Sequence, residues 1–427
     1  MTDAQDTAAD SSLRTTGGTP PDDAGSSVTG APTPLLEPRE GIPPVVADET
    51  ALAQVISAFA GGSGPVAVDA ERASGYRYGQ RAYLVQLRRE GAGTALIDPV
   101  AVGGGLSGLG DALSGTEWVL HAATQDLPCL REIDMVPSRL FDTELAGRLA
   151  GFPRVGLGAM VENVLGFVLE KGHSAVDWST RPLPEPWLRY AALDVELLVD
   201  LRDALEKELD RQGKLEWALQ EFDAIAAAPP AEPRKDPWRR TSGMHKVRRR
   251  RQLGVVREMW ETRDRIAQRR DVSPGKVLSD AAIVEAALAL PSNVHALAAL
   301  NGFGHRMGRR QLEQWQAAVD RAKALPDGAL PQPGQPVTGP PPPRAWADKD
   351  PAAAARLSAA RAGVTALAEQ LNLPQENLVS PDTVRRICWE PPKPVDAGSV
   401  EAALVGYGAR PWQVELVTPV LVKALSA

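Results

Sequence analysis

The sequence predicts an α/β domain followed by two small all-helical domains. From Val46 to about Gln212, short runs rich in β-branched residues alternate with amphipathic stretches, which is the pattern of an α/β domain. After this region the chain reads as helical, and a Pro-rich stretch from Pro326 to Arg344 divides the helical part in two. A chain of 427 residues also exceeds what one hydrophobic core usually organises.

The expected domain boundaries follow from these patterns. Residues 1–45 are rich in Gly, Pro, Ser, Thr and Asp, hold no aromatic residue and lack the basic start and apolar core of a signal peptide, so we expect a disordered tail. The remaining expected segments are the α/β domain (46–212), a linker (213–237), a first helical domain (238–325), a Pro-rich linker (326–345) and a second helical domain (346–427).

Alternating hydrophobic patterns place the elements of the α/β domain. Strands are expected at Pro65–Glu71, Ala82–Arg89, Thr94–Pro99 and Glu117–Ala123, and helices at Leu127–Ile133, Leu157–Phe167 and Trp187–Arg211. A short stretch with Gly and Tyr joins the first two strands, which favours a hairpin-like connection. The sheet should therefore be mixed.

Composition excludes some classes of protein. The hydrophobic fraction of 43% and the charged fraction of 24% are ordinary for a globular protein in water, and no apolar run approaches the length of a membrane span. We therefore expect no membrane role. The two cysteines, Cys129 and Cys388, lie far apart in dissimilar contexts, which indicates no disulfide framework or cysteine-rich metal site and fits a reducing cytoplasm.

Charge is distributed unevenly along the chain. The net charge of −7 argues against a uniformly basic nucleic-acid binder. Residues 234–251, the basic strip, nevertheless hold nine Lys or Arg against one Asp. The basic strip is a candidate phosphate-binding surface, and a solvated linker or helix face would explain its composition equally well.

The two helical domains share short sequence echoes. ALNGFG from Ala299 matches ALVGYG from Ala403, and SPGKVLSD from Ser273 matches PQENLVSP from Pro374. Each pair holds a similar position in its domain, which indicates a duplicated module. Short Gly-aromatic-Gly connections between helices also recur by chance, so this alternative stays open.

Asp69 and Glu71 are the first candidate site residues. They lie two residues apart at the end of the Val-rich strand PVAVDAE, so the strand's period of two turns both carboxylates to the same face. Two neighbouring acids repel each other, which suggests a neutralising cation, and oxygen ligands favour Mg²⁺ or Mn²⁺. Two solvated acids at a strand end would give the same pattern.

Asp126 supplies a third acid from another element. It comes just after a strand and at the start of a helix, where functional groups gather at the carboxyl edge of a sheet. An Asp in this place is also an ordinary helix N-cap. His121 is more simply read as a packed strand residue, and Asp98 and Asp142 are assigned to turn and helix-cap roles.

Tyr190 and Asp194 lie four residues apart on an expected helix and hence on one helical face. This pairs a phenol with a carboxylate. Taken alone, the pair could equally be a core aromatic residue beside a surface acid.

The three motifs together resemble the tyrosine-bearing branch of the DEDD exonuclease superfamily. The stretch DWSTRPLPEPWLRYAALDVELL is similar to ribonuclease D, and the resemblance covers about Val46 to Leu325. It implies an RNase H-like fold, in which helices flank a mixed sheet and the acids gather at one edge. It also identifies 251–319 as similar to the HRDC domain, named for helicases and ribonuclease D, and 346–427 as a more divergent second copy.

The resemblance further implies a 3′–5′ exonuclease that acts on RNA with two divalent ions, Mg²⁺ or Mn²⁺. Asp69 would contact both ions, Glu71 and Asp194 would complete the site of the attacking water, and Asp126 would serve the second ion. Tyr190 would orient the water. The expected products are nucleoside 5′-monophosphates, and the expected task is the 3′ maturation of tRNA or other stable RNAs.

Substrate contacts are expected from four further residues, Gln86, His121, Trp178 and Arg181, because their surroundings resemble the family's substrate-facing segments. Gln86 and Trp178 could equally be packing residues. The expected partner is RNA with a single-stranded 3′ end, including tRNA precursors. The HRDC-like domains and the basic strip would add a second grip on it. The sequence does not give the oligomeric state, and a monomer is assumed.

Two other functions stay open at this stage. A DNA-directed 3′–5′ exonuclease could use the same acids, and the order of nuclease and HRDC domains favours RNA. A nucleic-acid-binding scaffold without catalysis is disfavoured because all five motif residues are present.

Overall fold

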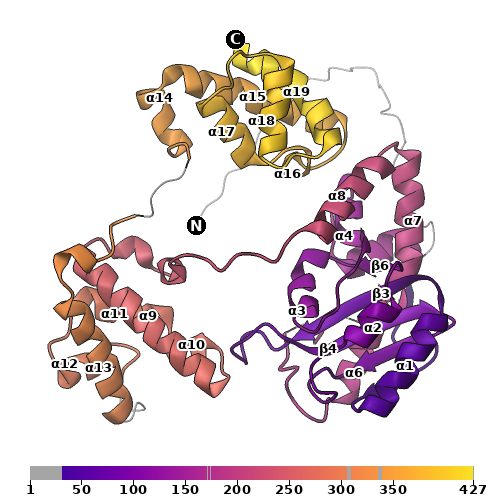
Figure 1. Cartoon of the computed structure of the whole chain (residues 1–427), viewed down its shortest axis with the longest axis horizontal. Helices are drawn as coiled ribbons and strands as arrows, with labels where there is room; N and C mark the ends of the chain where they lie inside the picture. The colour runs from indigo at the N-terminus through magenta and orange to yellow at the C-terminus, as the bar shows by residue number, and fades with distance from the viewer. Residues whose placement is uncertain (1–30, 171, 174, 305–308, 335–338, 427) are drawn as a thin grey trace, which may run out of the picture.

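A six-stranded sheet organises the α/β domain of the computed structural model, which describes residues 31–170, 172–173, 175–304, 309–334 and 339–426 (Figure 1). The strand order is β2-β5-β4-β3-β6-β7. Their bounds are β2 (Val45–Val46), β3 (Ser63–Arg72), β4 (Ala82–Glu90), β5 (Gly93–Ile97), β6 (Glu117–Leu120) and β7 (Arg139–Asp142). Strand β3 pairs antiparallel with β4 and parallel with β6, which confirms the predicted mixed sheet.

Helices cover both faces of this sheet because side chains alternate along its strands. On β3, Val66 and Val68 join the core beneath α1 and α2, whereas Ala67 packs on the opposite face with Val195 of α6. The helical elements of this domain are α1 (Glu49–Gly61), α2 (Ser107–Ala112), η1 (Ala123–Gln125), α3 (Leu127–Arg131), α4 (Thr143–Leu149), α5 (Leu157–Met160), η2 (Val161–Leu165), α6 (Glu185–Glu196), α7 (Leu198–Arg211) and α8 (Leu215–Ala227). Helix α6 therefore faces the odd-numbered side chains of β3.

Two helices predicted from sequence are shorter than expected. The stretch predicted as one helix up to Arg211 is interrupted at Leu197, whose φ of −115° and ψ of 7° leave the helical region and separate α6 from α7. The helix predicted to reach Phe167 ends at Gly166, which adopts a left-handed conformation, and strand β8 (Phe167–Leu169) follows.

Two predicted boundaries also differ from the structure. Strand β1 (Thr33–Leu35) lies inside the expected tail and pairs in parallel with β8, so the prediction of disorder is wrong there; residues 1–30 lie outside the described residues. Helix α8 lies inside the expected linker. Its Phe222 is 1% exposed and its ring lies 4.7 Å from that of Phe141 on β7, so α8 belongs to the α/β domain.

The two helical domains repeat one order of elements. The first contains α9 (Arg250–Arg270), α10 (Pro274–Val277), α11 (Asp280–Ala289), α12 (Val294–Ala298) and α13 (Arg309–Ala324), and the second contains α15 (Pro351–Gln370), α16 (Gln375–Leu378), α17 (Pro381–Trp389), α18 (Ala397–Gly406) and α19 (Pro411–Ser426). Short elements η3 (Pro237–Arg240), η4 (Met244–Lys246), η5 (Asp327–Ala329), η6 (Pro343–Ala345) and α14 (Trp346–Lys349) flank them. In each domain a long first helix precedes a helix of four residues, which lies within one of the sequence echoes.

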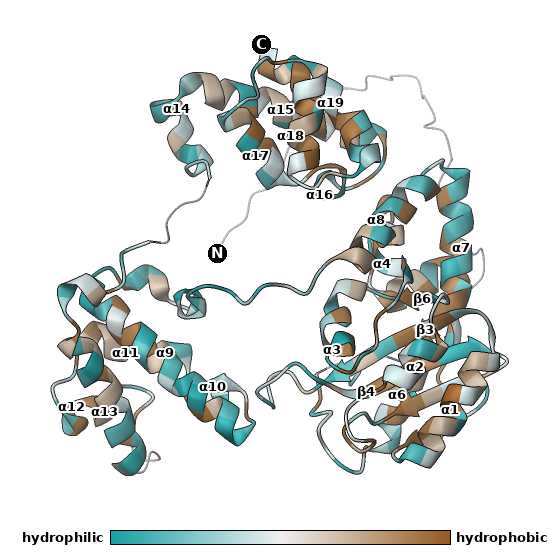
Figure 2. Cartoon of the chain, in the orientation of Figure 1, coloured by the Kyte–Doolittle hydropathy of each residue, from teal (hydrophilic) through white to brown (hydrophobic). Residues whose placement is uncertain are grey.

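Hydropathy agrees with this packing. Figure 2 shows both teal and brown residues on α7 and α9, as expected of helices that bury one face. On α7 the buried residues include Leu201, Leu205 and Leu209. No helix in the described part of the chain combines the length and the apolar character that crossing a membrane would require.

Both helical domains contact the α/β domain. In the second, the ring of Trp412 stacks on Trp217 of α8 with a centroid distance of 5.0 Å. In the first, Asp264 of α9 accepts a hydrogen bond from the Tyr78 hydroxyl at 3.0 Å. Tyr78 lies in the connection between β3 and β4, which reaches toward this domain in Figure 1.

Candidate active site

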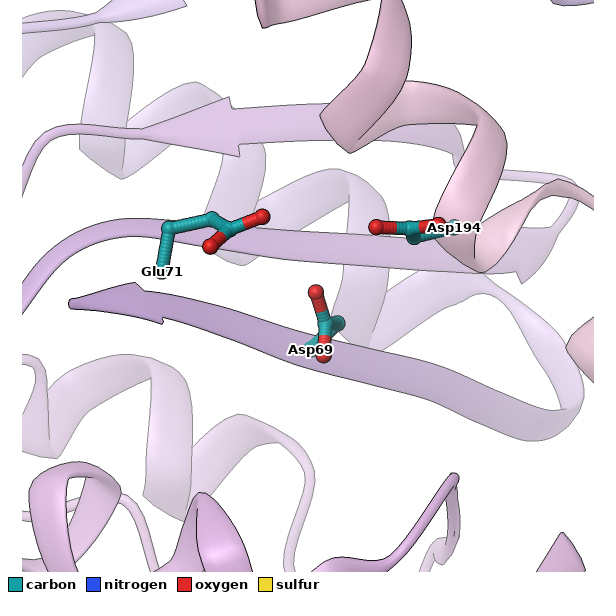
Figure 3. Close-up of side chains that lie close together, drawn as sticks. All are labelled: Asp69, Glu71 and Asp194. Carbon is teal, nitrogen blue, oxygen red and sulfur yellow. The ribbon is translucent and has the colours of Figure 1, made fainter. Parts of the chain in front are cut away.

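Three carboxylates converge between β3 and α6. Asp69 and Glu71 share the face of β3 that α6 covers, and Asp194 comes from α6 itself (Figure 3). One oxygen from each carboxylate lies within 4.8 Å of the others. Asp69 and Asp194 are half-buried as residues, and Glu71 is 9% exposed. The strand period and the packing of α6 thus bring together acids that are far apart in sequence.

Burial and mutual repulsion make these acids hard to ionise. Burial raises the pKa of Asp69 and raises that of Asp194 well above its usual range. The pKa of Glu71 is raised to about 10, first by burial and then by the charges of Asp69 and Asp194. A divalent cation would favour the ionised carboxylates, and three oxygen donors in one cluster match the ligand preference of Mg²⁺ and Mn²⁺. The residues present therefore fit a metal site.

Asp126 lies beside this cluster. Its side chain makes no N-capping hydrogen bond, which disfavours the helix-cap alternative, and forms an ion pair with Arg72 at 3.2 Å. Burial, followed by the charge of Asp69, raises the pKa of Asp126 to about 8. Its oxygens are not part of the cluster of three acids, so the structure brings Asp126 near Asp69 without completing a set of four.

Arg72 is a residue that the sequence analysis missed. It directly follows the acid pair at the end of β3, and it also donates a hydrogen bond to the Gln125 carbonyl at 2.8 Å. A lone arginine after an Asp-x-Glu pattern carries no distinctive spacing signal, so only the folded structure reveals its contact with Asp126.

Tyr190 lies one turn before Asp194 on α6. Burial and the charges of Asp194 and Glu71 raise the pKa of Tyr190 above its ordinary value. Its ring lies 6.5 Å from that of Trp178 and 5.9 Å from that of His173. The hydroxyl therefore stays protonated at neutral pH and can act as a hydrogen-bond donor beside the acids.

Gln86 and Trp178 are fully buried. Gln86 lies on β4 directly opposite Asp69, so the two side chains share one face of the sheet. Neither its amide nitrogen nor its amide oxygen has a hydrogen-bond partner among the described residues. Trp178 packs against Trp187 and Tyr190 with ring centroids 5.6 Å and 6.5 Å away.

The other two substrate-contact candidates form internal bonds. The guanidinium of Arg181 pairs with the Asp98 carboxylate and donates to the carbonyl of Tyr83. Burial lowers the pKa of His121 to about 4, and its Nδ1 lies 2.9 Å from the Thr143 hydroxyl. The structure brings none of the four candidates into the cluster of acids, and their role as substrate contacts remains a prediction.

The two acids set aside in the sequence analysis have the predicted structural roles. Asp142 caps α4 by accepting from the backbone of Glu144 and Leu145. Asp98 accepts from the backbone amides of Val100 and Ala101 in a turn.

Comparison with protein families assigns three segments of the chain. Residues 43–210 match a family described as 3′-5′ exonuclease, 252–319 match the HRDC domain, and 339–425 match a family described as 3′ to 5′ exonuclease C-terminal domain. The first segment contains the cluster of acids, Asp126 and Tyr190.

Individual proteins are similar over longer stretches. The ribonuclease D of Gluconacetobacter diazotrophicus is 36% identical over 289 residues, which cover 65% of this chain and 71% of that protein. A crystal structure of a protein from Bifidobacterium adolescentis is 38% identical, with a TM-score of 0.86, and covers 93% of this chain and 100% of that one. The crystal structure of Escherichia coli RNase D, described as an exoribonuclease involved in structured RNA processing, is 26% identical with a TM-score of 0.67. It covers 90% of this chain and 98% of that one.

Proposed function

Since the chain belongs to the ribonuclease D family and is a metal-dependent 3′–5′ exoribonuclease, we propose that it matures the 3′ ends of structured RNAs such as tRNA precursors. The observation that carries this proposal is the cluster of Asp69, Glu71 and Asp194, which offers a divalent ion three carboxylate oxygens within 4.8 Å of one another. The order of the matched segments, nuclease first and HRDC after, supports RNA over DNA as the substrate.

We assign the metal ligands as Asp69, Glu71, Asp126 and Asp194. When bound, two divalent ions, Mg²⁺ or Mn²⁺, would acidify a water molecule and relieve charge on the phosphoryl oxygens. Asp69 lies close enough to Glu71 and to Asp126 for its charge to raise the pKa of each, and so is suited to contact both ions. Arg72 would hold Asp126 in place beside Asp69.

Tyr190 is proposed to position the attacking water. Its raised pKa makes it a poor general base, so its hydroxyl would donate a hydrogen bond and not remove a proton. Attack of water on the last phosphodiester breaks the bond between phosphorus and the 3′ oxygen of the preceding nucleotide. A nucleoside 5′-monophosphate leaves, and the shortened RNA regains a 3′ hydroxyl.

The burial of Gln86 and Trp178 is compatible with an indirect part in substrate binding. Trp178 would support the ring of Tyr190, and Gln86 would orient Asp69 from the neighbouring strand. Contacts from His121 and Arg181 to the RNA are also proposed, and for Arg181 they would require it to exchange part of its present hydrogen bonds.

The helical domains are proposed to bind the structured part of the RNA. The second is proposed as a divergent copy of the HRDC domain, supported by its matching order of helices. The hydrogen bond between Tyr78 and Asp264 ties the first to the strand connection that follows the catalytic acids, which would keep bound RNA near them.

A tRNA precursor with a 3′ trailer tests this proposal. The wild-type protein with Mg²⁺ or Mn²⁺ should shorten the trailer and stop near the mature end, whereas Asp69→Asn should leave the precursor intact. A DNA strand of the same trailer sequence is the matched substrate control. Equal or faster degradation of the DNA would favour the DNA-directed alternative over RNA maturation.

A further inference from the structure

The basic strip divides into cations that stabilise the fold and cations that do not. Arg250 donates to the carbonyls of Asp327 and Leu330 at 2.6 Å and 2.9 Å. Arg251 donates to the Lys323 carbonyl at 3.2 Å and pairs with the Asp327 carboxylate at 2.9 Å. These two arginines fasten the end of α13 and the segment after it to the start of α9. Their charge is thus committed to the fold.

Arg240 and Arg248 differ from these two arginines. Both are exposed, and neither guanidinium has an ion-pair or hydrogen-bond partner in the described part of the chain. The nearby Arg239 already pairs with Asp236 at 2.9 Å and lies over the Trp238 ring at 4.3 Å. The positive charges of Arg240 and Arg248 are therefore not neutralised by the described part of the protein.

These cations border a groove in the first helical domain. The groove has a volume of about 530 Å³, with Met244, Val247 and Leu253 as its apolar lining and Arg239, Arg240 and Arg248 as its basic lining. Helix α9, which is 21 residues long, begins beside it and has no acidic residue in its first turn. The positive end of the helix dipole therefore adds to the arginine charges.

We propose that this groove binds phosphates of the RNA backbone, with Arg240 and Arg248 as the phosphate contacts. A planar guanidinium can hold a phosphate through two hydrogen bonds, and the apolar lining can accept the ribose or base beside it. The proposal rests on RNA being the substrate and adds a second binding site on the first helical domain. Arg250 and Arg251, despite belonging to the same strip, are not part of this site.

The test uses the full chain with both contacts removed, Arg240→Gln with Arg248→Gln. Binding to a single-stranded RNA is measured by fluorescence anisotropy in EDTA over a series of salt concentrations. The slope of the logarithm of the association constant against the logarithm of the salt concentration is negative. Loss of two phosphate contacts should make this slope less steep by about 1.4 and weaken binding at low salt by about tenfold or more. Hydrolysis of a dinucleotide with Mg²⁺ should stay at the wild-type rate, because a dinucleotide occupies the nuclease site alone.

Arg269→Gln with Arg270→Gln is the matched control, since it removes the same charge from exposed positions at the other end of α9. The control should keep the wild-type slope. Wild-type slope and affinity in the Arg240 and Arg248 variant would overturn the proposal. Equal losses in both variants would also overturn it, because general charge attraction would then explain the binding. If the wild-type protein does not hydrolyse the dinucleotide at all, the proposed function fails, whatever the binding data show for the groove.

Discussion

The cluster of acids should destabilise the metal-free protein, and a divalent ion should reverse this. Two full negative charges 4.8 Å apart repel each other by about 3.5 kcal/mol at an effective dielectric constant of ~20, and Asp69, Glu71 and Asp194 lie at or within that separation. In EDTA the folded protein avoids this repulsion by holding protons. Burial first, and the neighbouring negative charges second, raise the pKa of Glu71 to about 10 and that of Asp126 to about 8.

The sign of the pH dependence follows from these raised values. The folded state binds protons that the unfolded state has already released above about pH 4.5, so the free energy of unfolding contributed by these acids falls as pH rises toward the folded pKa values. In EDTA the melting temperature should therefore decrease between about pH 6 and about pH 9. Because the bound ion requires ionised carboxylates, the stabilisation by Mg²⁺ or Mn²⁺ should grow over the same range.

The magnitude can be measured by differential scanning fluorimetry. An ion at a hundred times its Kd adds about 2.7 kcal/mol to the free energy of unfolding, which raises the melting temperature of a domain of this size by roughly 5 to 11 °C. Asp69→Asn should melt higher than the wild type in EDTA and lose this shift. Asp223→Asn, an exposed acid on α8, is the control and should behave as the wild type. Equal shifts in wild type and Asp69→Asn, or no pH effect in EDTA, would refute the reasoning.

Three substitutions test other parts of the structure. Tyr190→Phe should lower kcat about a hundredfold or more while preserving the metal-induced melting shift, and loss of the shift would show that the hydroxyl supports metal binding instead. Gln86→Leu should raise the free energy of unfolding by about 1 kcal/mol, because it removes a buried amide without hydrogen-bond partners. It should also lower kcat, because Asp69 on the neighbouring strand would lose the side chain proposed to orient it. A loss of stability would mean that the amide is hydrogen-bonded. Trp412→Ala should lower the free energy of unfolding of the second helical domain by about 3 to 5 kcal/mol and make this domain more sensitive to proteolysis. Unchanged proteolysis would show that the stacking of Trp412 on Trp217 does not hold the domain in place.

The shared faces of four candidate site residues could be predicted from sequence because they follow local periods, whereas the assignment of the whole set rests on the resemblance to the family. The alternation of β3 turns Asp69 and Glu71 to one side, and the helical period of α6 places Tyr190 and Asp194 on one face. The mixed sheet follows from the same kind of pattern, since the short connection between β3 and β4 forces them to be antiparallel. These features depend on residues that are close in sequence.

What could not be predicted depends on distant partners. Strand β1 exists because β8, more than a hundred residues away, offers it a free edge, and no periodicity in three residues signals that pairing. The ion pair of Arg72 with Asp126 and the full burial of Gln86 likewise arise only once β6 and α6 have packed on β3. The interruption at Leu197 lies within an unbroken helical pattern and contains no Gly or Pro that would mark it.

The central claim, that the acid cluster catalyses 3′–5′ hydrolysis of RNA, is tested most directly by digestion of one single-stranded RNA labelled at either end. With Mg²⁺ or Mn²⁺, the 3′-labelled strand should release labelled mononucleotide at once, and the 5′-labelled strand should shorten step by step. Both results should disappear with EDTA or in Asp69→Asn. Intact RNA under every metal condition, or cleavage that continues in Asp69→Asn, would contradict the account.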